Sequence, residues 1–272
     1  MSLNVAILGC GNMGSFITKA IVNGEAGDIT LHTLIGTQRS IKKLEQLAEL
    51  ANCKWTTDPG TLEIDEVDLI IEAAGQQAVK DHMLSYLEKG KHIMIISIGA
   101  LAEREVYEKV LELSKKSGGQ VILPSGAIGG LDAIRSAAIG GLETVELITR
   151  KPPNALKGAP YVIEKGINLE NLQAEIEIFH GNALDAAKAF PENINVAAAL
   201  SLAGIGPERT RVTIAANPSL TRNTHEIRAA GACGEYCFKF ENNVSPENPK
   251  SSHLAVLSIL SALKEFQRTV LF

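Results

Sequence analysis

The first 124 residues alternate short apolar runs with segments whose hydrophobic positions recur at helical spacing. The apolar runs cover residues 3–8, 31–36, 67–73, 92–98 and 120–123. The helical segments between them cover residues 15–23, 40–51, 78–89 and 102–117. Strands that are apolar on both faces and joined by helices are typical of a parallel sheet covered on both sides. The pattern predicts an α/β fold, a Rossmann doubly wound parallel sheet.

The pattern changes after Pro124. A glycine-rich segment, residues 125–132, is followed by a short helical stretch that ends at Ala138. Strands are expected over residues 144–149, 175–180, 212–216 and 234–240, and helices over residues 183–190 and 193–203. These elements predict a second, smaller α/β domain with mixed or antiparallel strands. A last apolar-rich helix is expected over residues 251–267.

The first apolar run leads directly into a glycine turn, Gly9-Cys10-Gly11-Asn12-Met13-Gly14. This is a G-x-G-x-x-G pattern with a strand before it and a helix after it, the context that the motif requires. The first glycine permits the turn, the second lets the backbone approach a pyrophosphate, and the third lets the helix pack on the strand. Free N–H groups at the helix N-terminus favour the phosphates. We therefore assign cofactor contacts to Gly9, Gly11, Asn12, Met13 and Gly14.

Two domains follow from this placement. We expect a dinucleotide-binding (Rossmann) domain over residues 1–124, with the C-terminal helix in residues 246–272 packing back on it. We expect a substrate-binding, catalytic α/β domain over residues 125–245. A chain of 272 residues suits two domains of ordinary size.

The turn after the second strand bears on the choice of dinucleotide. Strands in NAD-specific sheets usually end there in an acid that binds the ribose 2′-hydroxyl. Here the residues are Gly36-Thr37-Gln38-Arg39-Ser40, with no acid among them. Arg39, with Thr37 and Ser40, can hold a 2′-phosphate, which predicts that NADP serves at least as well as NAD. The alternative is that Arg39 is a plain cation at the start of a helix.

Composition excludes several classes of protein. A net charge of −5 argues against nucleic acid or an acidic membrane surface as a partner. No cleavable leader and no apolar stretch of roughly 20 residues is visible, so a cytoplasmic protein is expected. Cys233 and Cys237 have no second Cys/His pair at zinc spacing, so we interpret them as small buried side chains in or near a strand. Neither a metal nor a disulfide is expected.

Several strings in the second half of the chain resemble the L-aspartate dehydrogenase family. They are residues 125–132 (SGAIGGLD), 149–153 (TRKPP), 181–183 (GNA), 190–200 (FPENINVAAAL), 223–227 (NTHEI) and 247–252 (ENPKSS). The resemblance implies an enzyme that interconverts L-aspartate with oxaloacetate and ammonia through iminosuccinate, using NAD or NADP. It also implies a role in supplying iminoaspartate to nicotinamide (NAD) biosynthesis.

The same resemblance assigns roles to three residues. It implies that His225 is the active-site histidine and that Ala127 and Asn195 contact the cofactor. The family often has Ala-Asp-Pro before the histidine segment, whereas this chain has Ala216-Asn217-Pro218. The departure puts the tuning of the histidine pKa in question.

The chemistry of the residues themselves adds to these assignments. A histidine titrates in the range needed to move protons to and from an amine, which suits His225 to that role. Two substrate carboxylates require cations, and Arg150 and Lys151 are the candidates, although a solvated basic pair at a strand end is the alternative. Asn195 can bind a nicotinamide carboxamide or cap a helix. Glu72 ends the central strand, in either a loop-capping or a catalytic role.

Two other functions stay open at this stage. One is a dehydrogenase for another small amino or keto acid, and the other is a catalytically silent NAD(P)-binding regulatory protein. The expected partners are a small-molecule substrate and further copies of the chain, as a homodimer or higher homo-oligomer.

Overall fold

The computed structural model describes residues 2–191, 194–246 and 252–270. The chain divides into two compact units, each with its own sheet and its own hydrophobic core. The first unit consists of Met1–Ala100, Arg104–Pro124 and Val256–Phe272. The second consists of Leu101–Glu103 and Ser125–Ala255.

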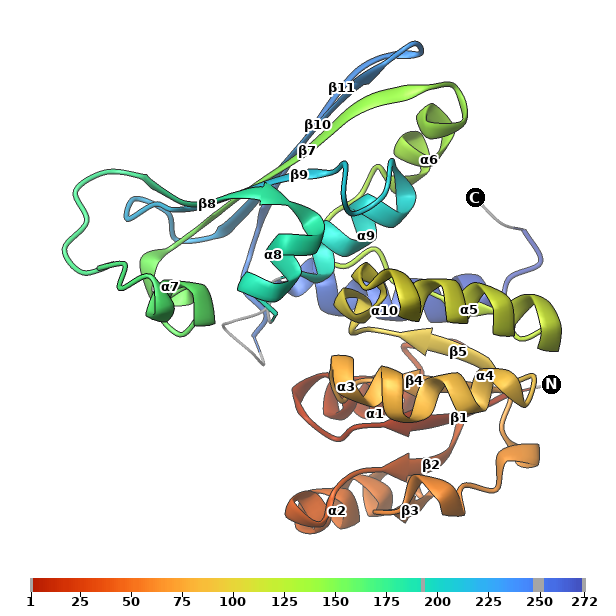
Figure 1. The fold of residues 1–272 in the computed structure, drawn as a ribbon. Coiled ribbons are helices and arrows are strands. Elements are labelled where there is room, and N and C mark those ends of the chain that lie inside the picture. The colour runs from red at the N-terminus through yellow and green to blue at the C-terminus, as the bar shows by residue number, and fades with distance from the viewer. Residues whose placement is uncertain (1, 192–193, 247–251, 271–272) are drawn as a thin grey trace. The chain divides into compact units, whose positions relative to one another are not determined.

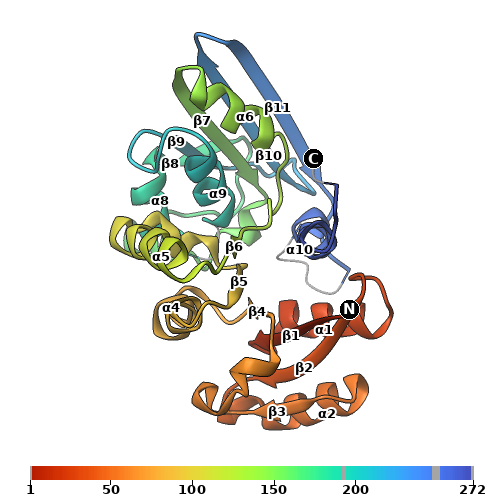
Figure 2. The same ribbon diagram turned by 90° about the vertical axis from the view of Figure 1, so that its right-hand side faces the viewer.

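The first unit contains a six-stranded parallel sheet with the order β3-β2-β1-β4-β5-β6 (Figure 1 and Figure 2). The strands are β1 (Leu3–Leu8), β2 (Ile29–Ile35), β3 (Lys54–Thr56), β4 (Leu69–Glu72), β5 (His92–Ile95) and β6 (Val121–Ile122). This is the Rossmann strand order, in which the direction of winding reverses between β1 and β4. The predicted fold class is confirmed.

Helices cover this sheet on both faces. They are α1 (Asn12–Val22), α2 (Ile41–Ala51), a helix of three segments, α5 (Arg104–Ser117) and α10 (His253–Phe266). The three segments are α3 (Gln76–Ala78), a π-helical turn (Val79–Met83) and α4 (Leu84–Glu88). Ile259, Leu260 and Leu263 of α10 share one buried cluster with side chains of α1, α2 and the central strands, so the C-terminal helix completes this core.

The second unit contains a five-stranded mixed sheet with the order β11-β10-β7-β9-β8. The strands are β7 (Leu142–Lys151), β8 (Ile176–Asn182), β9 (Arg211–Ala216), β10 (Asn223–Gly231) and β11 (Gly234–Asn242). Only the β7–β9 pair is parallel, and β10 and β11 form a long hairpin (Figure 2). The mixed sheet that the sequence predicts is therefore present.

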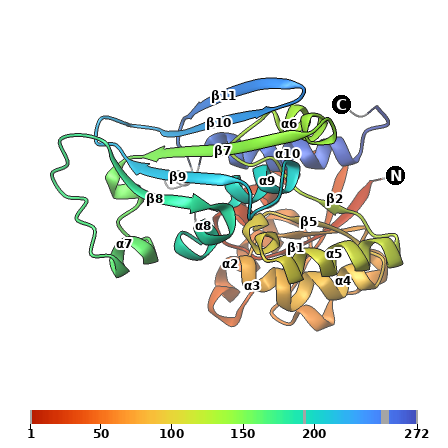
Figure 3. The ribbon, with the colours of Figure 1, turned by 45° about the horizontal axis from the view of Figure 1, so that its top comes forward.

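One face of this sheet is covered by helices and the other is open. The helices α6 (Leu131–Ile139), α8 (Ala183–Ala189) and α9 (Asn195–Ala203) lie on the same face (Figure 3), and the short α7 (Pro160–Glu164) packs into the same core. On β7 the side chains of Val145, Leu147 and Thr149 point toward the helices and are buried. The open face carries charged side chains, such as Glu146 and Arg228.

Several sequence expectations differ from the observed elements. The pattern missed β3, which presents exposed Lys54 and Trp55, and it missed β10, whose first three residues are polar and yet buried. The pattern predicts strand β5 over residues 92–98. The strand ends at Ile95, because a 3₁₀ turn begins at Ile98. Residues 193 and 251, the expected first residues of two helices, lie outside the described residues.

The interpretation of Cys233 and Cys237 as buried side chains is wrong. Both are exposed. Cys233 lies in the turn between β10 and β11, and Cys237 lies on β11, the edge strand of a sheet with one open face. Cys10 is buried and Cys53 is half-buried, and burial raises the pKa of the Cys53 thiol to about 11. No helix among the described residues is both long and apolar enough to cross a bilayer.

Candidate active site

The fold itself requires two of the three motif glycines. Gly9 has a φ of +108°, and a Cβ there would lie 2.6 Å from the Ala73 carbonyl carbon. A Cβ at Gly14 would lie 1.8 Å from the Gly9 carbonyl oxygen. Gly9 therefore serves the turn and its approach to the loop after β4, and Gly14 serves the packing of α1 against that turn.

Gly11 is different, because nothing in the protein requires a glycine there. Its φ is −64°, which any residue adopts, and a Cβ would meet no atom within 4 Å. The space beside Gly11 is open, at the N-terminus of α1, where Asn12 and Met13 begin the first turn and no acidic side chain is present. This arrangement fits the approach of a pyrophosphate to the backbone.

The turn after β2 places a cation on the same edge of the sheet. The Thr37 N–H donates to Ser40 Oγ (3.0 Å), and Ser40 Oγ donates to the Thr37 carbonyl (2.9 Å), so these two residues hold the turn together. Arg39 lies in this turn and is exposed. Lys43 of α2, one helical turn beyond Arg39, donates to the Gly11 carbonyl at 3.4 Å. Sequence reasoning missed Lys43, although its i+4 spacing from Arg39 was visible.

His225 lies on β10 and points toward the helix-covered face of the second sheet. Its side chain is buried, and Nδ1 lies 3.0 Å from Thr149 Oγ1 on the neighbouring strand β7. Burial, followed by the charge of Lys151, lowers the pKa of His225 to about 3. The imidazole is therefore neutral at physiological pH.

Lys151 ends β7 two residues beyond Thr149, so both side chains are on the face that carries His225. The lysine side chain is buried, and burial lowers its pKa to about 8. Thr149, Lys151 and His225 thus form a compact buried group in which the charge of the lysine acts on a neutral imidazole.

Arg150 is not part of this group. It points to the open face of the sheet, where it pairs with Glu226 (3.0 Å) and Glu175 (3.2 Å). Burial tends to raise the pKa of Glu226, but hydrogen bonds from Arg228 and Arg150 outweigh it and hold that pKa below its usual value. The structure therefore separates the two basic residues that the sequence analysis paired.

The carboxylate of Glu175, which pairs with Arg150, also explains why an asparagine suits position 217. Asn217 Nδ2 donates to Glu175 Oε2 at 2.7 Å, and the Asn217 backbone N–H donates to the Lys151 carbonyl at 2.9 Å. An aspartate side chain has no N–H to give to Glu175. The amide thus suits the carboxylate beside it.

The two remaining predicted cofactor residues lie in the second unit. Ala127 is buried, and its carbonyl accepts a hydrogen bond from Asn242 Nδ2 at 2.8 Å. Asn195 is the first residue of α9 and is half-buried. Ile194 occupies the N-cap position, so the alternative reading of Asn195 as a helix cap is wrong.

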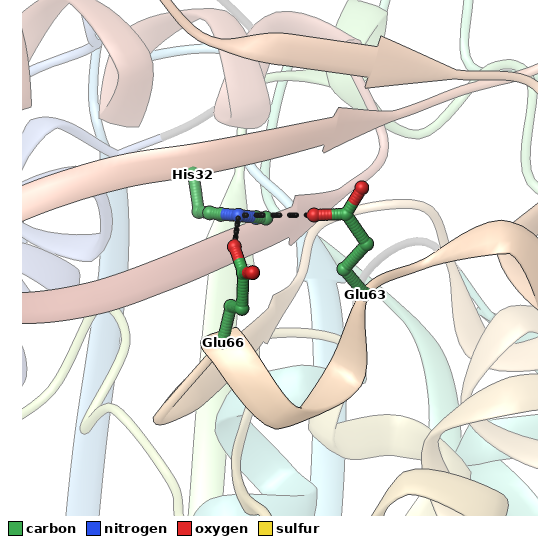
Figure 4. A group of neighbouring side chains, drawn as sticks. All are labelled: His32, Glu63 and Glu66. Carbon is green, nitrogen blue, oxygen red and sulfur yellow. Dashed lines mark hydrogen bonds and ion pairs between the residues drawn. The ribbon is translucent and has the colours of Figure 1, made fainter.

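Two other features lie outside this group. His32 Nε2 lies 2.9 Å from Glu66 and 3.8 Å from Glu63 (Figure 4), and Glu63 also pairs with Lys54. His32 and Lys54 already engage both carboxylates, and these contacts tie the loop before β4 to β2 and β3. A cavity of about 600 Å³ lies on the open face of the second sheet, lined by three arginines and three glutamates. None of the candidate active-site residues lines it.

The two units together define a class of protein. A Rossmann sheet with an open glycine turn is typical of dinucleotide-binding domains, and residues 9–124 match the model of the "Homoserine dehydrogenase, NAD binding domain" family. Residues 132–266 match the model described as "Aspartate dehydrogenase, C-terminal". The chain is thus built as an NAD(P)-binding oxidoreductase.

The relatives place the chain within this class. It is 46% identical over 272 residues to the L-aspartate dehydrogenase of Methanosarcina mazei, covering 98% of both chains. It is 41% identical to that of Methanococcoides burtonii, covering 97% of this chain and 96% of the relative. The chain belongs to the L-aspartate dehydrogenase family.

Solved structures agree with this assignment. The crystal structure of aspartate dehydrogenase from Thermotoga maritima superimposes with a TM-score of 0.77, at 30% identity and full coverage of both chains. A homoserine dehydrogenase from Thiobacillus denitrificans matches with a TM-score of 0.59 at 15% identity, covering 98% of this chain and 74% of that chain. The second likeness concerns the fold alone.

Burial of the Lys151 ammonium group has a cost that can be measured. A lysine pKa lowered from 10.5 to about 8 means that the charged form destabilises the fold by up to about 3 kcal/mol. Lys151→Met should therefore raise the free energy of unfolding at neutral pH. In the wild type this free energy should rise with pH between about 8 and 10.5, because the unfolded chain then binds a proton that the folded chain has lost. The methionine variant should lack that rise.

Denaturant unfolding at a series of pH values measures both effects. Lys157→Met is the matched control, because Lys157 is exposed and pairs with Glu170 at the surface. The control should change stability by no more than about 0.5 kcal/mol. A Lys151→Met variant no more stable than the wild type at neutral pH would contradict the prediction.

Proposed function

We propose that this protein is an NAD(P)-dependent L-aspartate dehydrogenase that interconverts L-aspartate with iminosuccinate, and then with oxaloacetate and ammonia. The observation that supports this most strongly is end-to-end similarity to L-aspartate dehydrogenases. The buried group of Thr149, Lys151 and His225 adds a suitable arrangement of side chains.

The reaction requires two changes at the substrate. The Cα–H bond breaks and its electron pair leaves as hydride, while the amine nitrogen loses a proton and forms the C=N bond of iminosuccinate. Water then adds to that carbon, and ammonia leaves to give oxaloacetate. The dinucleotide, when bound, accepts the hydride. The side chains of the protein have to bind the carboxylates and move the protons.

His225 is suited to the proton transfers. When its Nδ1–H donates to Thr149 Oγ1, the Nε2 lone pair is left to accept a proton from the substrate amine or from the attacking water. The 3.0 Å contact to Thr149 also limits rotation of the ring. Because the imidazole is neutral at physiological pH, it is in the state required of a proton acceptor.

Lys151 is suited to bind a substrate carboxylate. Its ammonium group lies among buried side chains, where a charge-assisted hydrogen bond to a carboxylate is stronger than in water. Its charge is also one cause of the lowered pKa of His225. Binding of a carboxylate offsets that charge, so His225 becomes a stronger base when substrate is present.

Absorbance of the reduced nicotinamide tests the proposed reaction. The purified protein is mixed with oxaloacetate, ammonium and either NADPH or NADH. Oxidation that requires both oxaloacetate and ammonium supports L-aspartate dehydrogenase. A panel in which other keto acids outrank oxaloacetate would favour a dehydrogenase with another substrate. Cofactor binding without turnover on any keto acid would favour a silent NAD(P)-binding regulatory protein.

Removal of the imidazole should abolish most of the activity. We expect His225→Ala to lower kcat/KM for L-aspartate by about 100-fold or more, the scale of acid–base catalysis. His180→Ala is the matched control, because His180 Nδ1 also lies 3.0 Å from a threonine hydroxyl, that of Thr213, but is exposed. The control should keep its activity within about twofold. A folded His225→Ala protein with unchanged kcat/KM would rule out the assigned role.

The cations near the glycine turn should set the cofactor preference. The wild type should bind NADPH at least as tightly as NADH, because Arg39 and Lys43 can both reach a 2′-phosphate. The double variant Arg39→Gln/Lys43→Gln should raise the Kd of NADPH by about tenfold or more, which is about 1.4 kcal/mol. It should leave the Kd of NADH within about twofold. Lys42→Gln, an exposed neighbour on α2, is the control and should change neither Kd.

Fluorescence titration of the reduced cofactor measures these constants. A wild-type preference for NADH of about tenfold or more would show that the inference from Arg39 is wrong.

Three further points belong to the same proposal. The enzyme supplies iminoaspartate to NAD biosynthesis, it acts in the cytoplasm, and it assembles as a homodimer or higher homo-oligomer. The family assignment supports the first point, and the absence of a membrane-spanning helix among the described residues is compatible with the second. Light scattering on the purified protein tests the third.

A further inference from the structure

A buried carboxylate lies at the cofactor edge of the first unit. Glu72 ends β4 and is fully buried, although the loop that follows it is partly exposed at Ala74. Its Oε1 accepts hydrogen bonds from the N–H groups of Ala74 and Gly75, both at 2.7 Å, and from Ser97 Oγ at 3.0 Å. Its Oε2 accepts from the Ser97 N–H at 2.9 Å.

These contacts join two loops that are not adjacent in the sequence. Ala74 and Gly75 follow β4, and Ser97 follows β5, so the carboxylate ties together the carboxyl ends of two neighbouring strands. The amide hydrogens of both loops point inward to Glu72.

The same loop is in close contact with the glycine turn. A Cβ at Gly9 would lie 2.6 Å from the carbonyl of Ala73 and 2.8 Å from the nitrogen of Ala74. The position of Gly9 thus depends on the position of the loop that Glu72 holds. In a Rossmann sheet the dinucleotide lies across the ends of these strands, at the point where the winding reverses.

We propose that Glu72 is a positioning residue for the dinucleotide, which acts by holding the loops after β4 and β5 in place against the glycine turn. The proposal rests on dinucleotide binding by the first unit, which is part of the proposed function. It assigns Glu72 no contact with the substrate. It also predicts equal effects on NADH and NADPH, since Glu72 lies away from the turn after β2 that holds Arg39.

The hydrogen-bond pattern explains why a carboxylate is needed. All four partners donate, so the site requires a side chain that only accepts, and a glutamine would direct its NH₂ group at one of the donors. An unsatisfied buried N–H costs about 1–3 kcal/mol. Glu72→Gln preserves the shape of the side chain and releases one of the two loops.

The test compares this variant with a carboxylate at the opposite end of the same strand. Asp68 immediately precedes β4, and its Oδ2 accepts from the Asn4 N–H at 2.8 Å, away from the cofactor edge. Glu72→Gln should raise the Kd of both NADH and NADPH by about tenfold or more, with an unchanged ratio between them. Asp68→Asn should leave both constants within about twofold. The KM for L-aspartate at saturating cofactor should stay within about twofold in both variants.

The outcomes are distinguishable. If folded Glu72→Gln binds both cofactors like the wild type, or if Asp68→Asn weakens binding equally, Glu72 has no positioning role. If Glu72→Gln does not fold, Ser97→Ala gives the answer, since loss of one hydrogen bond to Glu72 should raise both constants about threefold. A wild-type protein that binds neither cofactor would overturn the proposed function itself, and this inference with it.

Discussion

Lys151 and His225 lie close together on the buried, helix-covered face of the second sheet, and this proximity constrains the charge of both side chains. Water stabilises charged side chains strongly, and the surroundings of Lys151 and His225 provide little of that stabilisation. The two groups cannot both be cationic at low cost, so the imidazole stays neutral while the lysine keeps its proton near neutral pH. In the proposed reaction a substrate carboxylate changes this balance, because its negative charge offsets part of the effect of the Lys151 charge on His225. Under the proposed mechanism, selectivity for acidic substrates and activation of His225 as a base have the same physical origin.

The proposed function divides dinucleotide binding and proton transfer between the two units. The first unit uses backbone groups at the ends of parallel strands, which suits a ligand that is recognised through its phosphates. The second uses side chains on the helix-covered face of a mixed sheet, whose long strands hold Thr149 and His225 in register. On the open face of that sheet, Arg150, Glu175 and Glu226 neutralise one another. Neighbouring residues of β7 thus serve different purposes because a strand alternates its faces.

Sequence reasoning reached the architecture more easily than the site. The Rossmann strands were evident because each is a continuous apolar run, as in Val5 to Leu8 and Leu69 to Ile71. Strand β10 escaped notice because its first residues, Asn223 to His225, are polar, and only tertiary contacts explain their burial. The opposite directions of Arg150 and Lys151 also depended on knowing that β7 extends through both. The sequence shows the spacing of Lys43 from Arg39 and the position of Glu72 at a strand end, but only the structure shows their contacts with Gly11 and with the loops after β4 and β5.

The three glycines of the turn carry different kinds of information about related chains. Gly9 and Gly14 are required by the folded backbone, so any descendant with this turn must keep them whether or not it binds a nucleotide. A Cβ at Gly11 would meet no other atom, and its φ is one that any residue adopts, so the fold alone would tolerate a substitution by alanine. An evolutionary line that abandons the dinucleotide should therefore lose this glycine first. In a related chain, a glycine at position 11 therefore indicates that the turn still binds a dinucleotide. Glycines at positions 9 and 14 indicate only that the turn still folds in this way.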